Sequence, residues 1–368
     1  MNLLKEVELA STGVYLPGEA IPFEKVEGII GDLDGAPSRI KRMIPKLKKT
    51  VTEILKAKRC YFAYDPKTKQ PTENNTSMVV KAIKTALQKI SMDPQEIDYL
   101  AVGMPVPDYI IPCTTPLIQE QLGIKHCSEI EIHSNCTAIT KVLEAAFHAL
   151  SVGRYKNAVV VYSQNPSAYL NAEYYNQEQV SIDNLLLRWF LSDCATAVVL
   201  KAQDKIDSGI KLEGVYNESV GSDLKTAMWL RIGASDFNLP KVYKEGLHHF
   251  GQDYSTVNKK APIIGTEGLG RLMEHFKIKG EEVDHLVVTL PSYKLEDTAK
   301  EMVSKELGIN PEKWFSNVEQ KGYCGGGSLI SSVDELIERD LFTQGKLIIG
   351  FAVESSKWMN GGFVLKNK

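Results

Sequence analysis

Residues 96–105 read Glu-Ile-Asp-Tyr-Leu-Ala-Val-Gly-Met-Pro, and residues 282–291 read Glu-Val-Asp-His-Leu-Val-Val-Thr-Leu-Pro. The two stretches share the pattern E-[I/V]-D-x-L-x-V-x-[M/L]-P and lie 186 residues apart without a gap. Each copy follows a helical pattern and precedes a second helix that ends in Leu-Gly-Ile, at 122–124 and 307–309. Because the order of elements repeats along with the residues, the sequence predicts that the chain contains one structural unit twice.

Helical and strand patterns alternate through both copies. The strands are short and apolar throughout, which is typical of strands that are buried on both faces of a sheet. They lie at 99–103, 158–162, 195–200, 285–290 and 347–352. The pattern predicts an α/β fold in which helices cover central sheets, with two similar halves near 1–205 and 206–368.

The bulk properties agree with this picture and exclude several classes of function. The chain has 368 residues, which is more than a single core usually holds. Its formal net charge of −3 gives no general attraction to nucleic acid or to an anionic membrane. We expect a cytoplasmic protein without a membrane span, because no apolar run reaches spanning length and no signal segment precedes the patterned sequence. The six cysteines show no metal-ligand spacing, so we expect reduced thiols and no metal.

One cysteine, Cys136, stands where a strand pattern changes into a helical one. Residues 129–134 alternate polar and apolar side chains, and residues 139–150 carry apolar side chains at helical spacing. Free backbone N–H groups and the helix dipole favour an anion at the start of a helix. We therefore expect a lowered pKa for the Cys136 thiol and a backbone N–H that can bind an oxyanion, as a nucleophile needs. The alternative is a small buried side chain, the usual role of an isolated cysteine.

Five segments resemble, in order and with similar gaps, the β-ketoacyl-acyl-carrier-protein synthase III family of the thiolase superfamily. They are the opening strand and turn at 11–17, the nucleophile region at 122–138, the segment at 190–200 (against the family's F-G-D-G-A-G-A-x-V-L), the segment at 283–292 and the segment at 322–335 (against the family's G-N-x-x-x-A-S…D-E). Together they cover nearly the whole chain.

This resemblance implies a thiolase fold, five layers in the order αβαβα built from two pseudo-symmetric halves. It implies an acyltransferase of fatty acid biosynthesis that moves an acyl group from acyl-CoA or acyl-carrier protein onto Cys136. The acyl group is then condensed with a malonyl thioester, with loss of carbon dioxide. The resemblance implies no tightly bound cofactor, and the usual assembly is a homodimer.

Only the cysteine of the family's cysteine–histidine–asparagine site is present. Ser292 stands at the position of the histidine, and Tyr323 stands at the position of the asparagine. The C-terminal glycine-rich turn that supplies an oxyanion donor in the family reads Val-Glu-Ser-Ser at 353–356. The candidate catalytic residues are therefore Cys136, Ser292 and Tyr323. Ser292 and Tyr323 can each donate a hydrogen bond but cannot carry a proton near neutral pH as an imidazole does. The alternative for both is an ordinary position in the core or in the lining of the pocket.

Three functions are compatible with these departures. The chain is an active acyl-transferring or condensing enzyme with altered second and third site residues. Alternatively, it is a catalytically degenerate subunit that forms a heterodimer with an active paralogue. The third function is acyl transfer without decarboxylative condensation, which needs no enolate stabilisation.

Further residues have a possible place near the site. Residues 39–59 hold nine basic residues and one acidic residue on a helical pattern, and they either dock an acidic carrier protein or coenzyme A phosphates or form a solvated basic face. His248 and His249 lie in an irregular excursion that could reach the pocket. The pseudo-symmetry places the turn that carries Cys324 opposite Cys136, so Cys324 is a candidate for lining the same cavity.

Overall fold

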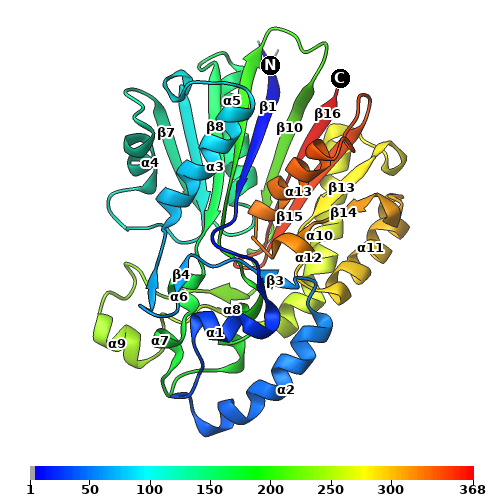
Figure 1. The fold of residues 1–368 in the computed structure, drawn as a ribbon. Helices are drawn as coiled ribbons and strands as arrows, with labels where there is room; N and C mark the ends of the chain where they lie inside the picture. Colours follow the sequence, from blue (N-terminus) through cyan, green and yellow to red (C-terminus); the bar gives the residue numbers. More distant parts are fainter. Residues whose placement is uncertain (1–4) are drawn as a thin grey trace.

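The computed structural model describes residues 5–368 and contains a ten-stranded mixed sheet as its largest element (Figure 1). In spatial order its strands are β14 (Trp314–Phe315), β13 (His285–Val288), β15 (Leu347–Glu354), β16 (Met359–Asn367), β10 (Ile210–Ser219), β1 (Glu6–Tyr15), β9 (Cys194–Gln203), β8 (Asn157–Gln164), β6 (Tyr99–Met104) and β7 (Ser128–His133). The predicted α/β class is confirmed.

The sheet repeats its own topology about its centre, where β1 and β10 pair antiparallel. When the five strands of each side are numbered along the chain, both sides have the same spatial order from the centre outward: first, fifth, fourth, second and third. The strand β6 begins at Tyr99 and β13 begins at His285, 186 residues later, and both are the second strand of their side. The connection between β9 and β10 contains the proposed boundary at 205/206. This repetition supports the division into halves 1–205 and 206–368, which we keep as a proposal.

Helices pack on the sheet in three layers, and the buried clusters show which helices share a layer. The helices are α3 (Asn75–Lys89), α4 (Thr114–Leu122), α5 (Ala138–Ser151), α10 (Tyr254–Phe276), α11 (Tyr293–Leu307) and α13 (Gly327–Glu338). The apolar faces of α5 and α13 form one cluster with strands of both sides of the sheet, so these two helices form the central layer. The helices α3 and α4 cover the outer face of one side, and α10 and α11 cover the outer face of the other. The layer order is therefore αβαβα.

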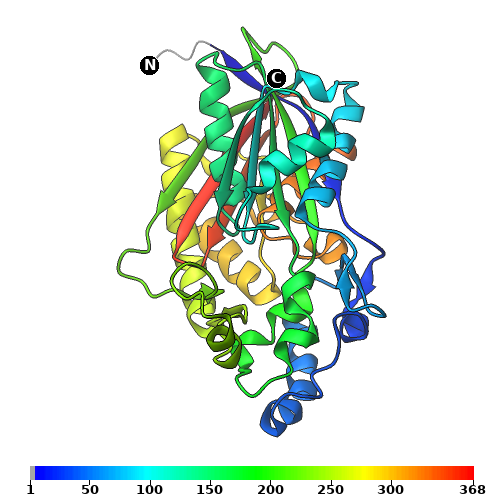
Figure 2. The ribbon, with the colours of Figure 1, turned by 90° about the vertical axis from the view of Figure 1, so that its left-hand side faces the viewer.

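A second group of short elements closes one end of the sheet, away from the end where β1 starts and β16 finishes (Figures 1 and 2). It comprises α1 (Val26–Ile30), α2 (Ser38–Ile54), α6 (Ser167–Leu170), α7 (Ala172–Tyr175), α8 (Leu187–Phe190), α9 (Leu239–Lys244), α12 (Val318–Lys321) and the strand pairs β2 (Ile21–Pro22) with β3 (Arg59–Cys60), β4 (Tyr64–Asp65) with β5 (Gln70–Pro71) and β11 (Met228–Trp229) with β12 (Gly251–Gln252). We call this group of elements the cap. Many of its elements share one buried apolar cluster, so the cap packs as a unit.

The helix α2 is the basic segment that the sequence singled out. Only Ile40 and Val51 of α2 are buried, so most of its basic side chains face solvent. Two of the basic residues at 39–59 nevertheless form ion pairs, since Lys48 bonds to Glu27 and Lys56 bonds to Glu296. Lys41 and Lys58 donate to backbone carbonyl oxygens. Between residues 5 and 368, no helix is both long enough and apolar enough to cross a membrane.

Candidate active site

Cys136 lies between the last residue of β7, His133, and the first helical residue of α5, Ala138. The strand alternates polar and apolar residues up to its end, and the helix begins where apolar residues recur at helical spacing. The chain must turn between these two elements, and the turn holds the Cys136 side chain in a cavity. Cys136 is half-buried for this reason.

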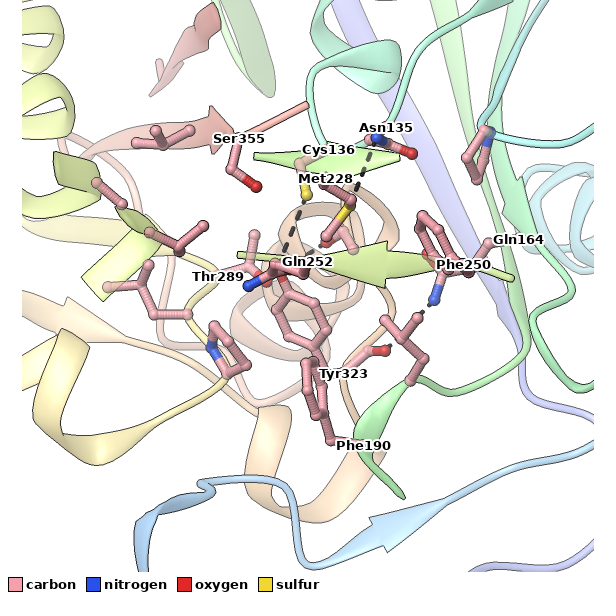
Figure 3. A pocket seen from close by; sticks show the side chains of 18 of the residues that line it. Asn135, Cys136, Gln164, Phe190, Met228, Phe250, Gln252, Thr289, Tyr323 and Ser355 are labelled. Carbon is pink, nitrogen blue, oxygen red and sulfur yellow. Dashed lines mark hydrogen bonds between the residues drawn. The ribbon is translucent and has the colours of Figure 1, made fainter. Parts of the chain in front are cut away.

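This cavity has a volume of about 60 Å³ and lies at the carboxyl ends of several strands (Figure 3). Its lining combines aromatic side chains with a few polar ones and includes Cys136, Tyr162, Gln164, Phe190, Phe250 and Tyr323. The lining residues come from both sides of the sheet and from the cap. Open α/β sheets usually bind ligands at this end of their strands.

A second, smaller cavity of about 30 Å³ adjoins the first between α10 and α11. Its walls are almost entirely carbon, with Leu269, Trp314 and Phe351 among them. The two cavities share the walls formed by Ala261, Leu290, Leu295 and Val353. Together they give Cys136 an apolar extension away from the polar residues of the first cavity.

Tyr323 is the nearest hydrogen-bonding side chain to the nucleophile candidate. Its hydroxyl lies 3.7 Å from the Cys136 sulfur, as the dashed line in Figure 3 marks. The turn that carries Tyr323 continues into glycines because it presses against the elbow. A Cβ atom on Gly326 would lie 2.6 Å from the Cys136 carbonyl oxygen, and Gly325 has a φ of +54°. Glycine at these positions therefore lets the hydroxyl of Tyr323 approach the sulfur.

The structure places a buried carboxylate, Glu354, at the start of the nucleophile helix. One of its oxygens accepts hydrogen bonds from the Thr137 N–H at 3.1 Å, the Thr137 hydroxyl at 2.6 Å and the Ser134 hydroxyl at 2.8 Å. Thr137 is the N-cap residue of α5 and makes no cap with its own side chain. Glu354 thus supplies from β15 the negative group that a helix N-terminus favours.

The expected lowering of the Cys136 pKa is wrong. Burial, followed by the negative charge of Glu354, raises the pKa of the thiol to about 12, and the hydrogen bond from Tyr323 opposes this only in part. A lowered pKa requires a free helix N-terminus. In the structure a carboxylate already occupies it, so a thiolate would be a second anion in a site that excludes water.

The chain matches no protein-family model, yet it has related proteins along its whole length. The β-ketoacyl-acyl-carrier-protein synthase III of Clostridium acetobutylicum is 22% identical over 352 residues, which cover 95% of each protein. Among solved structures, 3-oxoacyl-acyl-carrier-protein synthase III (FabH) from Pseudomonas aeruginosa superposes with a TM-score of 0.76 at 15% identity, covering 98% of each chain. OleA from Xanthomonas campestris superposes with a TM-score of 0.79 at 16% identity, covering the whole of both chains.

The chain is thus similar, along nearly its whole length, to β-ketoacyl-acyl-carrier-protein synthase III proteins. The agreement with solved structures along the full chain also confirms the predicted thiolase fold.

Ser292, for which the sequence resemblance predicts the position of the family's histidine, is not among the residues that line the cavity. It is the N-cap of α11, and its hydroxyl accepts a hydrogen bond from the Leu295 N–H at 3.3 Å. The residues before it, Thr289, Leu290 and Pro291, line the cavity instead. A serine side chain is too short to cap the helix and reach into the cavity at once. The structure therefore brings Cys136 and Tyr323 together but leaves Ser292 outside.

The histidines of the irregular excursion do not line the cavity either. A ring N–H of His248 and one of His249 each donate to the carbonyl oxygen of Tyr174, at 3.0 and 2.8 Å. Burial lowers the pKa of His249 to about 4, so its ring is neutral at ordinary pH. The neighbouring Phe250, and not the histidines, reaches the cavity.

Cys324 is buried beside Cys194 and does not line the cavity, although it follows Tyr323 directly. Successive residues in an extended turn point in opposite directions, which places Tyr323 inward and Cys324 into the core.

Proposed function

We propose that this protein is an acyltransferase that takes an acyl group from a coenzyme A or carrier-protein thioester onto Cys136. One observation carries this proposal. The Cys136 thiol faces a largely apolar cavity at the carboxyl ends of the strands, with the Tyr323 hydroxyl 3.7 Å from the sulfur. An apolar cavity limits the access of water, which would otherwise hydrolyse an acyl-cysteine.

The proposed step is an exchange of thioesters. The Cys136 sulfur forms a bond to the acyl carbon, the bond from that carbon to the leaving sulfur breaks, and the proton of the Cys136 thiol ends on the leaving thiol. Tyr323 donates a hydrogen bond to the Cys136 sulfur as negative charge develops there, and the Cys136 N–H is the candidate donor to the oxyanion. The thioester is already activated, so the step needs no tightly bound cofactor.

The second cavity indicates the chemical class of the acyl group. A wall of carbon atoms between α10 and α11 suits an aliphatic chain, because such a chain gains free energy from burial and makes no hydrogen bonds there. The chain would pass Ala261 and Val353, which border both cavities. We propose an acyl group longer than acetyl as the substrate.

Decarboxylative condensation has weaker support than acylation. Stabilising a malonyl enolate requires donors at a second place, and removing one such donor typically costs a factor of about 10² to 10³ in rate. Ser292 lies outside the cavity, so Tyr323 is left as the sole candidate of the altered pair. We propose slow or absent decarboxylation by the protein alone.

A degenerate partner subunit is the second candidate function. The raised pKa of Cys136 and the placement of Ser292 away from the cavity both favour it. Such a subunit would keep the acyl cavity and complement an active paralogue in a heterodimer, whereas the active enzyme would form the usual homodimer.

The two candidates are separated by mass spectrometry of the intact protein after incubation with acyl-CoA and acyl-carrier thioesters of increasing chain length. The acyltransferase gains one acyl mass, and the Cys136→Ala variant gains none. No adduct with any thioester would refute the acyltransferase and favour the partner subunit. A malonyl thioester labelled at the free carboxylate, added to the acylated protein, measures decarboxylation. Release of labelled carbon dioxide at several turnovers a minute would refute the proposal that the protein alone decarboxylates slowly or not at all.

A further inference from the structure

The buried carboxylate of Glu354 has no part in the thioester exchange, yet it lies in the same elbow as the nucleophile. Glu354 is the last residue of β15, and only 2% of its surface is exposed. Burying a carboxylate is costly unless its oxygens are hydrogen-bonded. The contacts of Glu354 should therefore show what this charge does.

Both oxygens of Glu354 are satisfied, and every donor is neutral. One oxygen takes the three hydrogen bonds from Ser134 and Thr137. The other accepts from the Ser356 hydroxyl at 2.5 Å. Across residues 5–368, no lysine, arginine or histidine forms an ion pair with Glu354; the nearest link to a cation runs through the Ser134 hydroxyl, which accepts from the Lys141 ammonium at 2.8 Å. The negative charge of Glu354 is stabilised by hydroxyl groups and a backbone N–H, and no positive charge in the described part of the chain contacts it directly. Its field therefore still acts on the neighbouring thiol.

We propose that Glu354 is a positioning residue that occupies the N-terminus of the nucleophile helix in place of the Cys136 thiolate, and so holds Cys136 as a neutral thiol in the resting protein. This inference deepens the proposed function, because it concerns the state of the same thiol before a thioester arrives. Its test uses no thioester, so it stands or falls separately.

The groups that face Cys136 from other elements agree with this assignment. The Tyr323 hydroxyl contacts the sulfur from the turn before α13, and Tyr162 approaches from β8. Burial raises the pKa of both phenols, so both are neutral. Lys141, on α5 itself, points its ammonium to Ser134 and to the sulfur of Met359. Burial is the larger cause of the raised pKa of Cys136, and among these groups the charge of Glu354 is the one that adds to it.

A neutral resting thiol has a consequence for the chemistry. Alkylating reagents and oxidants attack the thiolate, so the resting Cys136 is protected from them. A thioester also reacts with the thiolate, so the Cys136 proton must leave during the attack, and it ends on the leaving sulfur. The exchange then begins and ends with neutral thiols and leaves the charge of the elbow unchanged.

The test is the pH dependence of iodoacetamide labelling at Cys136, followed by peptide mass spectrometry between pH 6 and 10.5. The Glu354→Gln variant removes the charge and keeps an oxygen that can accept from Thr137. We expect its rate profile to move down by about one pH unit or more, since a like charge nearby typically shifts a pKa by that amount. The Glu354→Asp variant keeps the charge and should keep the profile of the unaltered protein.

Glu131 offers a matched control. It accepts from the Thr114 N–H at 2.6 Å and so caps the start of α4, as Glu354 caps the start of α5. The Glu131→Gln variant should leave the Cys136 profile where it is. An equal shift in both glutamine variants, or no shift in Glu354→Gln, overturns the proposal.

The unaltered protein gives a second test that does not depend on a variant folding. Exposed Cys113 serves as the internal reference in the same peptide digest. We expect Cys136 to label far more slowly than Cys113 at pH 8 and to keep accelerating up to pH 10.5. A Cys136 profile that levels off below pH 8 would overturn the proposal directly.

Discussion

The substitution Tyr323→Phe tests the contact on which the proposed acyl transfer depends. It removes the hydroxyl 3.7 Å from the Cys136 sulfur and keeps the aromatic ring, which packs edge-on against Phe190 with 5.7 Å between ring centroids. A hydrogen bond to a charged group is worth about 1.5–3 kcal/mol. Because 3.7 Å is long even for a bond to sulfur, we take about 1.5–2 kcal/mol. At about 1.4 kcal/mol per factor of ten, acylation should slow roughly ten- to thirtyfold.

The assay is single-turnover acylation of Cys136, read by intact mass at several thioester concentrations. The loss should appear in the limiting rate and not in the concentration for half-maximal rate, because the contact forms with a charge that develops only during reaction. Tyr169→Phe is the matched control, since Tyr169 lines the same cavity without contacting the sulfur. Equal rates for Tyr323→Phe and the unaltered protein would refute the role of this hydroxyl.

Three further predictions concern the surroundings of the site. Ser292→Ala should lower the free energy of unfolding by about 1 kcal/mol through loss of the α11 cap, with acylation unchanged; slowed acylation would restore a catalytic role. Gly265→Val should reduce adducts of long acyl groups but not of acetyl, because a Cβ at position 265 would lie 2.8 Å from the Val353 side chain in the wall of the second cavity. An equal loss of both adducts would refute the proposal that this cavity holds the acyl chain. Lys46→Glu with Lys49→Glu should weaken binding of an acidic carrier protein, most strongly at low salt, and unchanged binding at low salt would mark α2 as a solvated face.

The parts of the fold that depend on local periodicity could be predicted from the sequence. Apolar strands without alternation indicated a sheet covered on both faces, and the copies at 96–105 and 282–291 became β6 and β13, each the second strand of its side. The elbow at Cys136 followed from the change of period between β7 and α5. In each case the residues that set the structure are neighbours in the chain.

Contacts between distant segments could not be predicted in this way. Glu354 lies more than 200 residues from the helix that it caps, and the strand pattern gave it no partner. Burial, and after it the charge of Glu354, reversed the sign of the predicted pKa shift at Cys136. The role of Ser292 could have been predicted from neighbouring residues. A serine directly before a helical pattern indicates an N-cap, and Ser292 is the N-cap of α11 and not a counterpart of the catalytic histidine.

The altered residues together suit one kind of chemistry better than another. An enolate formed beside Cys136 would be a second anion near Glu354, and two like charges repel by about 4 kcal/mol at 4 Å and half that at 8 Å when the effective dielectric constant is about 20. Among residues 5–368, no imidazole lines the cavity to offset this repulsion, since Ser292 caps α11 and His249 bonds to Tyr174. A thioester exchange passes one proton between two sulfurs and ends without a new charge. A site with a neutral thiol, a neutral tyrosine and a fixed carboxylate therefore favours acyl transfer over decarboxylation. Glu354→Gln should accordingly raise any residual release of carbon dioxide from a malonyl thioester while Ser292→Ala leaves it unchanged, and a parallel response of the two variants would contradict this electrostatic account.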